Sequence, residues 1–71
     1  MKTNLKLLDA VALTVDFPEH KLVTGQVGTI VEVLDDHVFE VEFSDDNGRS
    51  YALVGLPAET LIALHYGPVA A

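Results

Sequence analysis

Apolar and polar residues alternate almost without interruption from residue 25 to residue 56. Three runs combine this period of two with β-branched and aromatic residues, and they cover residues 26–34, 38–43 and 50–56. The polar segment Asp35-Asp36-His37 separates the first two runs, and Asn47-Gly48 separates the last two, as is typical of hairpin turns. This pattern indicates consecutive antiparallel strands. The chain is therefore predicted to be all-β.

A further strand is expected before this stretch. Lys6–Thr14 is interpreted as the first strand, with Leu8, Val11 and Leu13 in the core. A short helical turn also fits part of this segment, because Leu7, Leu8 and Val11 have a compatible spacing.

The C-terminal part predicts one turn and one more strand. Pro57–Leu61 is expected to form a single helical or 3₁₀ turn, because proline suits the first helical position. Leu61–Leu64 then forms a short closing strand. We therefore expect one domain over residues 1–64. Residues 65–71 show no period and are expected to be a flexible tail.

The second strand, 26–34, carries apolar residues at both its odd and its even positions, so either side could face the core. We assign the odd-numbered positions to the core, namely Val27, Thr29, Val31 and Val33. Gly28 interrupts this strand, which predicts a close backbone approach or a bulge.

The third strand, 38–43, has a clearer pattern. Its inward residues are expected to be Phe39, Val41 and Phe43, while Glu40 and Glu42 face water. Asn47-Gly48 is the strongest hairpin signal in the chain and should pair this strand with the next one.

Five short strands, a long first loop (Val15–Gly25) and a turn before the last strand describe a small, strongly bent barrel. Closure of a barrel removes the exposed edges that a hydrophobic sheet would otherwise present. The order resembles an SH3-like barrel, and the segments that carry the resemblance are Gly25-Gln26-Val27-Gly28-Thr29-Ile30-Val31, Phe39-Glu40-Val41-Glu42-Phe43 and Gly48. Similar strands open the barrels of ribosomal KOW-type domains, the photosystem I accessory subunit PsaE and the nitrile hydratase β-subunit. The resemblance implies a fold and little chemistry.

A closer resemblance covers most of Leu5 to Leu64. The segments that carry it are Lys6–Leu13, Phe17–His20, Gly25–Thr29 and Tyr51–Leu53. They look like a bacterial family of short stand-alone proteins that is catalogued as a domain of unknown function. Members resemble the small partner in two-gene operons, which implies an antitoxin-like or accessory role. The resemblance supplies no catalytic residues.

Composition narrows the possible partners. Eleven acidic residues and four Lys and Arg give a formal net charge of −7. Such a surface repels nucleic-acid backbones and anionic membranes, so neither is expected as a partner. The absence of cysteine fits a reducing compartment, and no apolar targeting segment follows the start of the sequence, so a cytoplasmic location is expected.

Hydrophobic content predicts an interaction surface. A chain of 71 residues with 49% hydrophobic residues has little interior in which to bury them. Ile30, Leu34 and Val54 lie on the strand faces opposite those assigned to the core, together with Val38, Ala52 and Leu56. We expect Val54 to contact a partner, with Ile30 and Leu34 behind it. Glu40 and Glu42 would rim this face and select a basic partner.

The long first loop provides a second candidate surface. Phe17, Pro18 and His20, with Tyr51, could line an aromatic groove for an extended or proline-rich segment. In the alternative interpretation, Phe17 fills the open end of the barrel and Pro18 stiffens the loop.

Other kinds of site are not predicted. Asp35-Asp36-His37 and Asp45-Asp46-Asn47 offer metal ligands, but they lack the calcium-loop pattern and are explained by turn preference. His20 and His37 have no third partner at zinc spacing. No nucleophile motif is present, and a barrel of this length rarely encloses a substrate-sized pocket. We therefore expect no cofactor, no small-molecule substrate and no enzymatic activity.

Two functions remain open. The first is a non-enzymatic module that binds a partner protein, antitoxin-like or as an accessory subunit. The alternative is a homo-oligomeric structural protein with no separate ligand. The sequence does not separate them.

Overall fold

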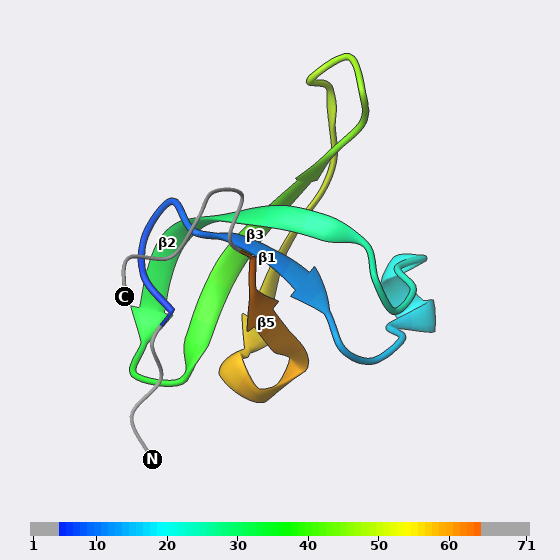
Figure 1. Cartoon of the computed structure of the whole chain (residues 1–71). Helices are drawn as coiled ribbons and strands as arrows, with labels where there is room; N and C mark the ends of the chain where they lie inside the picture. The colour runs from blue at the N-terminus through cyan, green and yellow to red at the C-terminus, as the bar shows by residue number, and fades with distance from the viewer. Residues whose placement is uncertain (1–4, 65–71) are drawn as a thin grey trace, which may run out of the picture.

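The computed structural model describes residues 5–64, so the tail predicted at residues 65–71 lies outside the described residues. Five antiparallel strands form one sheet in the order β4-β3-β2-β1-β5 (Figure 1). The strands are β1 (Ala10–Leu13), β2 (Val27–Asp35), β3 (Val38–Ser44), β4 (Ser50–Pro57) and β5 (Leu61–Ala63).

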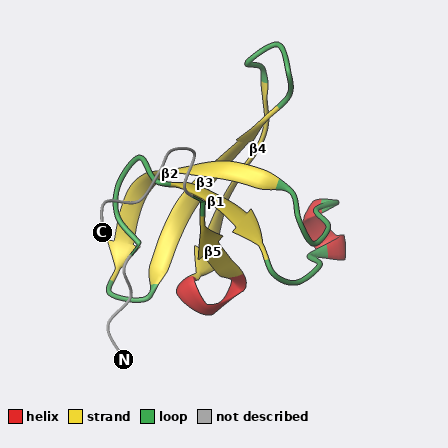
Figure 2. Cartoon of the chain, in the orientation of Figure 1, coloured by secondary structure: helices red, strands yellow, loops and turns green. Residues whose placement is uncertain are grey.

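Two short 3₁₀ helices complete the described part of the chain, η1 (Pro18–His20) and η2 (Ala58–Thr60) (Figure 2). η1 lies in the long first loop and was not predicted. η2 precedes the last strand, as expected from Pro57. The prediction of an all-β fold with five antiparallel strands and a 3₁₀ turn before the last strand is thus confirmed. Within residues 5–64 no helix is long and apolar enough to cross a membrane.

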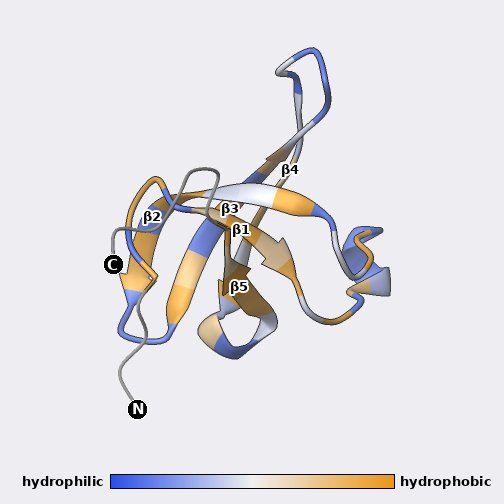
Figure 3. Ribbon diagram, viewed as in Figure 1, coloured by the Kyte–Doolittle hydropathy of each residue, from blue (hydrophilic) through white to orange (hydrophobic). Residues whose placement is uncertain are grey.

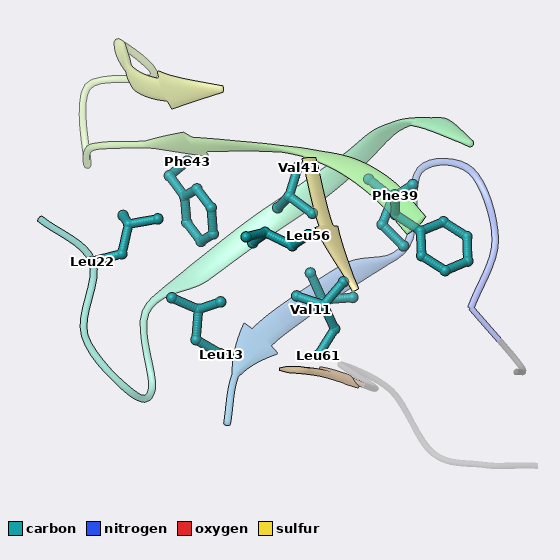
Figure 4. Packing of buried hydrophobic residues seen from close by; sticks show 9 residues of the cluster. Val11, Leu13, Leu22, Phe39, Val41, Phe43, Leu56 and Leu61 are labelled. Atoms are coloured by element: carbon teal, nitrogen blue, oxygen red, sulfur yellow. The ribbon is translucent and has the colours of Figure 1, made fainter. Parts of the chain in front are cut away.

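The sheet curls around a single core, although its two edge strands are not paired with each other. Within residues 5–64, β4 pairs with no strand other than β3, and β5 with none other than β1. The inward side chains of β3 meet those of β1 and β5 across the interior (Figure 4). Hydrogen bonds therefore do not close the barrel that the sequence predicts.

Nine apolar side chains form the core, and β3 supplies three of them. Phe39, Val41 and Phe43 are at most 2% exposed, so their predicted inward positions are confirmed. The rest of the core comes from the other four strands and the first loop, and consists of Val11, Leu13, Leu22, Ile30, Leu56 and Leu61. Burial of these side chains is the main favourable contribution to folding.

The first strand is shorter than the sequence predicts. Residues 6–9 form a turn, in which the Asp9 N–H donates to Lys6 O at 3.1 Å. Leu8 has a φ of +72° and is 73% exposed, so its predicted place in the core is wrong. The Leu8 N–H instead donates to Ile30 O at 2.8 Å, which anchors the turn beside β2. Val11 and Leu13 are buried as expected.

In the first half of β2 the inward side is the opposite of the one predicted: Ile30 is fully buried, whereas Val27 is 45% exposed. The register shift between Ile30 and Glu32 then reverses the alternation, so that Val33 pairs with the buried Phe39, on the predicted side, although Val33 stays 50% exposed. The reason for the difference in the first half lies at Gly28, which pairs with Phe43 on the inner side. A Cβ on Gly28 would lie 2.6 Å from Val41 Cγ1, so only glycine leaves room there for the large β3 side chains. The close approach predicted at Gly28 is confirmed, and Ile30 is corrected from a surface contact to a core residue.

β4 requires the same correction. Leu56 is 1% exposed, and Ala52 and Val54 are half-buried against the core. Their inward orientation follows from the register, since Val54 pairs with the buried Val41. Val54, which the sequence suggests as the main partner contact, therefore lies on the inner side of the sheet and packs against the core.

The hairpin between β3 and β4 forms where Asn47-Gly48 predicts it. Gly48 adopts a φ of +77°, a left-handed conformation that a Cβ would disfavour. The Asp45 carboxylate accepts the N–H groups of Asn47 and Arg49 at 2.9 and 3.0 Å. These bonds hold the turn that brings β4 back beside β3.

The packing at Gly28 predicts the effect of a single methyl group. Gly28→Ala should lower the free energy of unfolding by about 1–3 kcal/mol, because the neighbours at its Cβ position include the rigid backbone oxygen of Glu42 at 2.9 Å. Gly55→Ala is the matched control, because its nearest neighbour is the flexible end of Leu34 at 3.1 Å. It should change the free energy of unfolding by less than about 1 kcal/mol. Urea denaturation of both variants measures this, and equal midpoints would refute the packing argument.

Candidate functional site

The outer side of β2, β3 and β4 carries the acidic residues that the sequence placed at a partner surface. Glu40 pairs with Gly55 of β4 on one side and with Glu32 of β2 on the other. Glu42 pairs with Leu53 and with Thr29. Glu40 and Glu42 are half-buried, whereas Glu32 is exposed. Figure 3 shows the resulting alternation of hydrophobic and hydrophilic positions along β3.

Leu34 joins this outer side from the end of β2. The ladder between β2 and β3 shifts register between Val33 and Asp35, which displaces Leu34 from regular alternation. Its Cδ1 atom comes within 3.1 Å of the position that a Cβ on Gly55 would take. Leu34 thus extends over β3 towards β4 and stays 46% exposed. Its predicted outward position is confirmed.

We define the outer acidic face as Glu32, Leu34, Glu40, Glu42 and Leu53. Leu53 is 56% exposed, so this face combines two accessible leucines with three carboxylates. In residues 5–64, none of these carboxylates forms an ion pair or a side-chain hydrogen bond. Glu32 and Glu40 stand directly opposite each other, and like charges in such a pair repel. A basic group from another molecule would relieve this repulsion.

Of the residues suggested for an aromatic groove, Pro18, His20 and Tyr51 are exposed and Phe17 is half-buried. Phe17 is half-buried against the core and is bridged to Leu22, in line with the alternative in which it fills the end of the barrel. Pro18 and His20 are exposed on η1, and the His20 ring centroid lies 6.4 Å from that of Phe17. Tyr51 lies on β4, where its ring centroid is 6.4 Å from that of Phe43 and its hydroxyl accepts a hydrogen bond from Gln26 Nε2 at 2.9 Å.

The acidic turns use their carboxylates to hold the backbone. Asp35 Oδ1 accepts the His37 N–H at 2.7 Å, just as Asp45 caps the β3–β4 turn. η1 and the β2–β3 turn, which contain His20 and His37, lie at opposite ends of the sheet in Figure 1. Over residues 5–64 the structure brings together no group of three or more potential metal ligands.

A second outer surface was missed by the sequence analysis. Ala12 of β1 pairs with Ile62 of β5 and with Val27 of β2, so the three share one row across the outer side. Ile62 and Val27 are 55% and 45% exposed, and none of the three residues in this row is charged. The sequence feature that could have indicated this surface is the pair Ala10 and Ala12. These residues alternate with the buried Val11 and Leu13, so they lie on the outer side of β1.

Asp16 stabilises the end of the first loop. Its Oδ1 atom accepts the backbone N–H of Thr24 at 2.7 Å and the Thr24 hydroxyl at 2.8 Å. The backbone bond, and then the hydroxyl bond, lower the pKa of Asp16 below its ordinary value of 3.8. These bonds tie Asp16 to the segment that leads into β2.

Comparison with known proteins gives one match. The model of a family described as "Domain of unknown function (DUF4926)" matches residues 7–63. No curated protein and no solved structure matches the chain. The matched range runs from the turn before β1 to the end of β5.

The lowered pKa of Asp16 predicts a pH-dependent contribution to stability. A carboxyl group with a depressed folded pKa stabilises the fold above its unfolded pKa, and this contribution disappears as the pH falls through the folded value. Asp16→Ala should therefore be less stable than the wild type at neutral pH, and the difference should shrink as the pH falls below 3.8. Urea denaturation at a series of pH values, from 7 down to about 2 as far as the protein stays folded, measures this difference in unfolding free energy. A difference that does not vary with pH would contradict the role of the ionised carboxylate.

Proposed function

The chain belongs to the DUF4926 family, and from this starting point we propose that it is a non-enzymatic module that binds a partner protein through the outer acidic face. The supporting observation is the combination of exposed Leu34 and Leu53 with three carboxylates that have no cationic partner in the described residues. Protein interfaces commonly pair an apolar contact region with charges complementary to the partner.

The expected partner is basic. The chain has a formal net charge of −7, and the repulsion between Glu32 and Glu40 is relieved when Lys or Arg approaches. Complementary charge mainly accelerates association and selects the partner, while burial of the two leucines supplies affinity. The interaction would serve an antitoxin-like or accessory role in the cytoplasm of a bacterium, and the strand order supports an SH3-like barrel as its scaffold.

Charge reversal on this face tests the proposal. Glu40→Lys with Glu42→Lys should slow association with the captured partner roughly tenfold at low salt, and much less at high salt. The matched control is Glu19→Lys with Glu59→Lys, which makes the same change in net charge on η1 and η2. The measurement is affinity capture from a lysate of the source organism, followed by association kinetics with the purified companion.

The comparison between the two double variants decides the outcome. The wild type and the control should recover one stoichiometric basic protein, and the outer-face variant should lose it. Recovery of the same protein by all three forms, or of none by the wild type, would overturn the proposal. Circular dichroism establishes that both variants remain folded.

A homo-oligomer is the second candidate, favoured by the uncharged row of Ile62, Ala12 and Val27. Two copies could meet there without bringing the outer acidic faces together. In that case sedimentation velocity should show a concentration-dependent oligomer that Ile62→Lys dissociates. Val23→Lys is the matched control, since Val23 is 57% exposed in the first loop and Ile62 is 55% exposed in β5. A monomer at all concentrations would exclude this candidate.

A further inference from the structure

The two edges of the sheet differ in how they are protected. β5, at one end of the strand order, is three residues long, which leaves little backbone for another strand to pair with. β4, at the other end, is eight residues long and, in the part of the chain that the structure describes, is paired only with β3. Natural sheets usually protect a long edge with charged residues, prolines or bulges, because its unpaired N–H and C=O groups can bind another chain.

β4 has few of these protections. From Ser50 to Leu56 the strand carries no charged residue and no proline. The register shift opposite Phe43 and Ser44 affects only its first residues, and Pro57 is its last. Within residues 5–64, two hydrogen bonds reach β4 from outside the sheet: the Thr60 hydroxyl donates to Pro57 O at 2.7 Å, and Gln26 Nε2 donates to the Tyr51 hydroxyl at 2.9 Å. Both lie at the ends of the strand. The edge from Ala52 to Leu56 is therefore available for pairing.

We propose that an extended basic segment of a partner protein adds to β4 as a sixth strand. This inference rests on the proposed function and specifies how the partner is bound. Main-chain hydrogen bonds to an exposed edge supply affinity in this mode of recognition, and alternate side chains supply specificity.

Gly55 gives the edge its preference for a basic residue. It is exposed and pairs with Glu40, and it places no side chain of its own between Glu40 and the open edge. The nearest side-chain atom there is the flexible Cδ1 of Leu34, 3.1 Å from the position that a Cβ on Gly55 would take. An added strand would lie about 4.8 Å beyond β4. A Lys or Arg opposite Gly55 would extend past Leu34 Cδ1 to Glu40. A second one, two residues away and opposite Leu53, would lie on the same side near Glu42, which pairs with Leu53.

A second copy of the chain fits this edge less well. Two β4 strands would pair without any Lys or Arg opposite Gly55, because Ser50–Pro57 contains neither residue. Each copy would also bring a net charge of −7 and its own outer acidic face to the contact. Charge therefore favours a basic partner over self-pairing.

The test uses a defined peptide probe. A fluorescent eight-residue peptide of alternating lysine and valine is titrated with the chain at low salt, and binding is followed by anisotropy. Two further versions carry N-methyl groups either on every lysine nitrogen or on every valine nitrogen. Because alternate residues of a strand direct their N–H groups to opposite edges, only one version should lose binding, by at least about tenfold. A peptide of alternating glutamate and valine should not bind.

Variants of Gly55 provide the second arm. Gly55→Lys places a cation beside Glu40 on the open edge and should weaken peptide binding at least about tenfold. Val23→Lys is the matched control for net charge, and it should weaken binding less than about threefold, because the charge lies in the first loop. Gly55→Ala separates the effect of the cation from that of the added carbon, and it should bind nearly as well as the wild type.

Each result bears on the proposal. Equal binding by both N-methylated peptides, or equal effects of Gly55→Lys and Val23→Lys, would show that the peptide is held by charge alone and would overturn strand addition. A dimer of the chain that Gly55→Lys separates would make a second copy the occupant and would also overturn it. If the captured partner depends on Glu40 and Glu42 but not on Gly55→Lys, the proposed function stands and strand addition fails.

Discussion

The inward face of β3 is the feature on which the rest of the structure depends. Phe39, Val41 and Phe43 are almost completely removed from water, and β3 is flanked on both sides by paired strands. In a chain this short, two buried phenylalanines represent a large share of the available apolar burial. Their bulk also explains Gly28, since the backbone of β2 has to approach Phe43 and Val41 closely.

The order of the elements was predictable, but the inward side of two strands was not. In β3 only one side is apolar, so Glu40 and Glu42 mark the outer side unambiguously. β2 and β4 are apolar on both sides, and a one-residue change of assignment exchanges every side chain. The register shifts next to Val31 and Leu34 weaken the period further. Gly28 was the available signal, because a glycine inside a strand marks a close approach on its own side.

The candidate site was partly predictable for the same reason. Leu34, Glu40 and Glu42 lie on the outer side as expected, whereas Ile30 and Val54 belong to the core. Leu53 was missed because it shares a strand with the wrongly assigned Val54. The proposed function and the β4 edge are linked, since Glu40 pairs with Gly55. This pairing brings an unneutralised carboxylate next to an open strand edge, and neither feature is visible in the sequence alone.

The sequence by itself determined the all-β class, the Asn47-Gly48 hairpin, the inward face of β3 and the acidic surface, because local periodicity and turn preferences act over a few residues. The tertiary structure decided which side of β2 and β4 is buried, that Leu8 leaves the core, and that β4 lies at the edge of the sheet. These outcomes depend on packing between strands that are distant in the chain. Gly28, and not Val27, lies opposite Phe43 because the interior of the curled sheet has no room there for a Cβ, and a local sequence pattern does not contain this information.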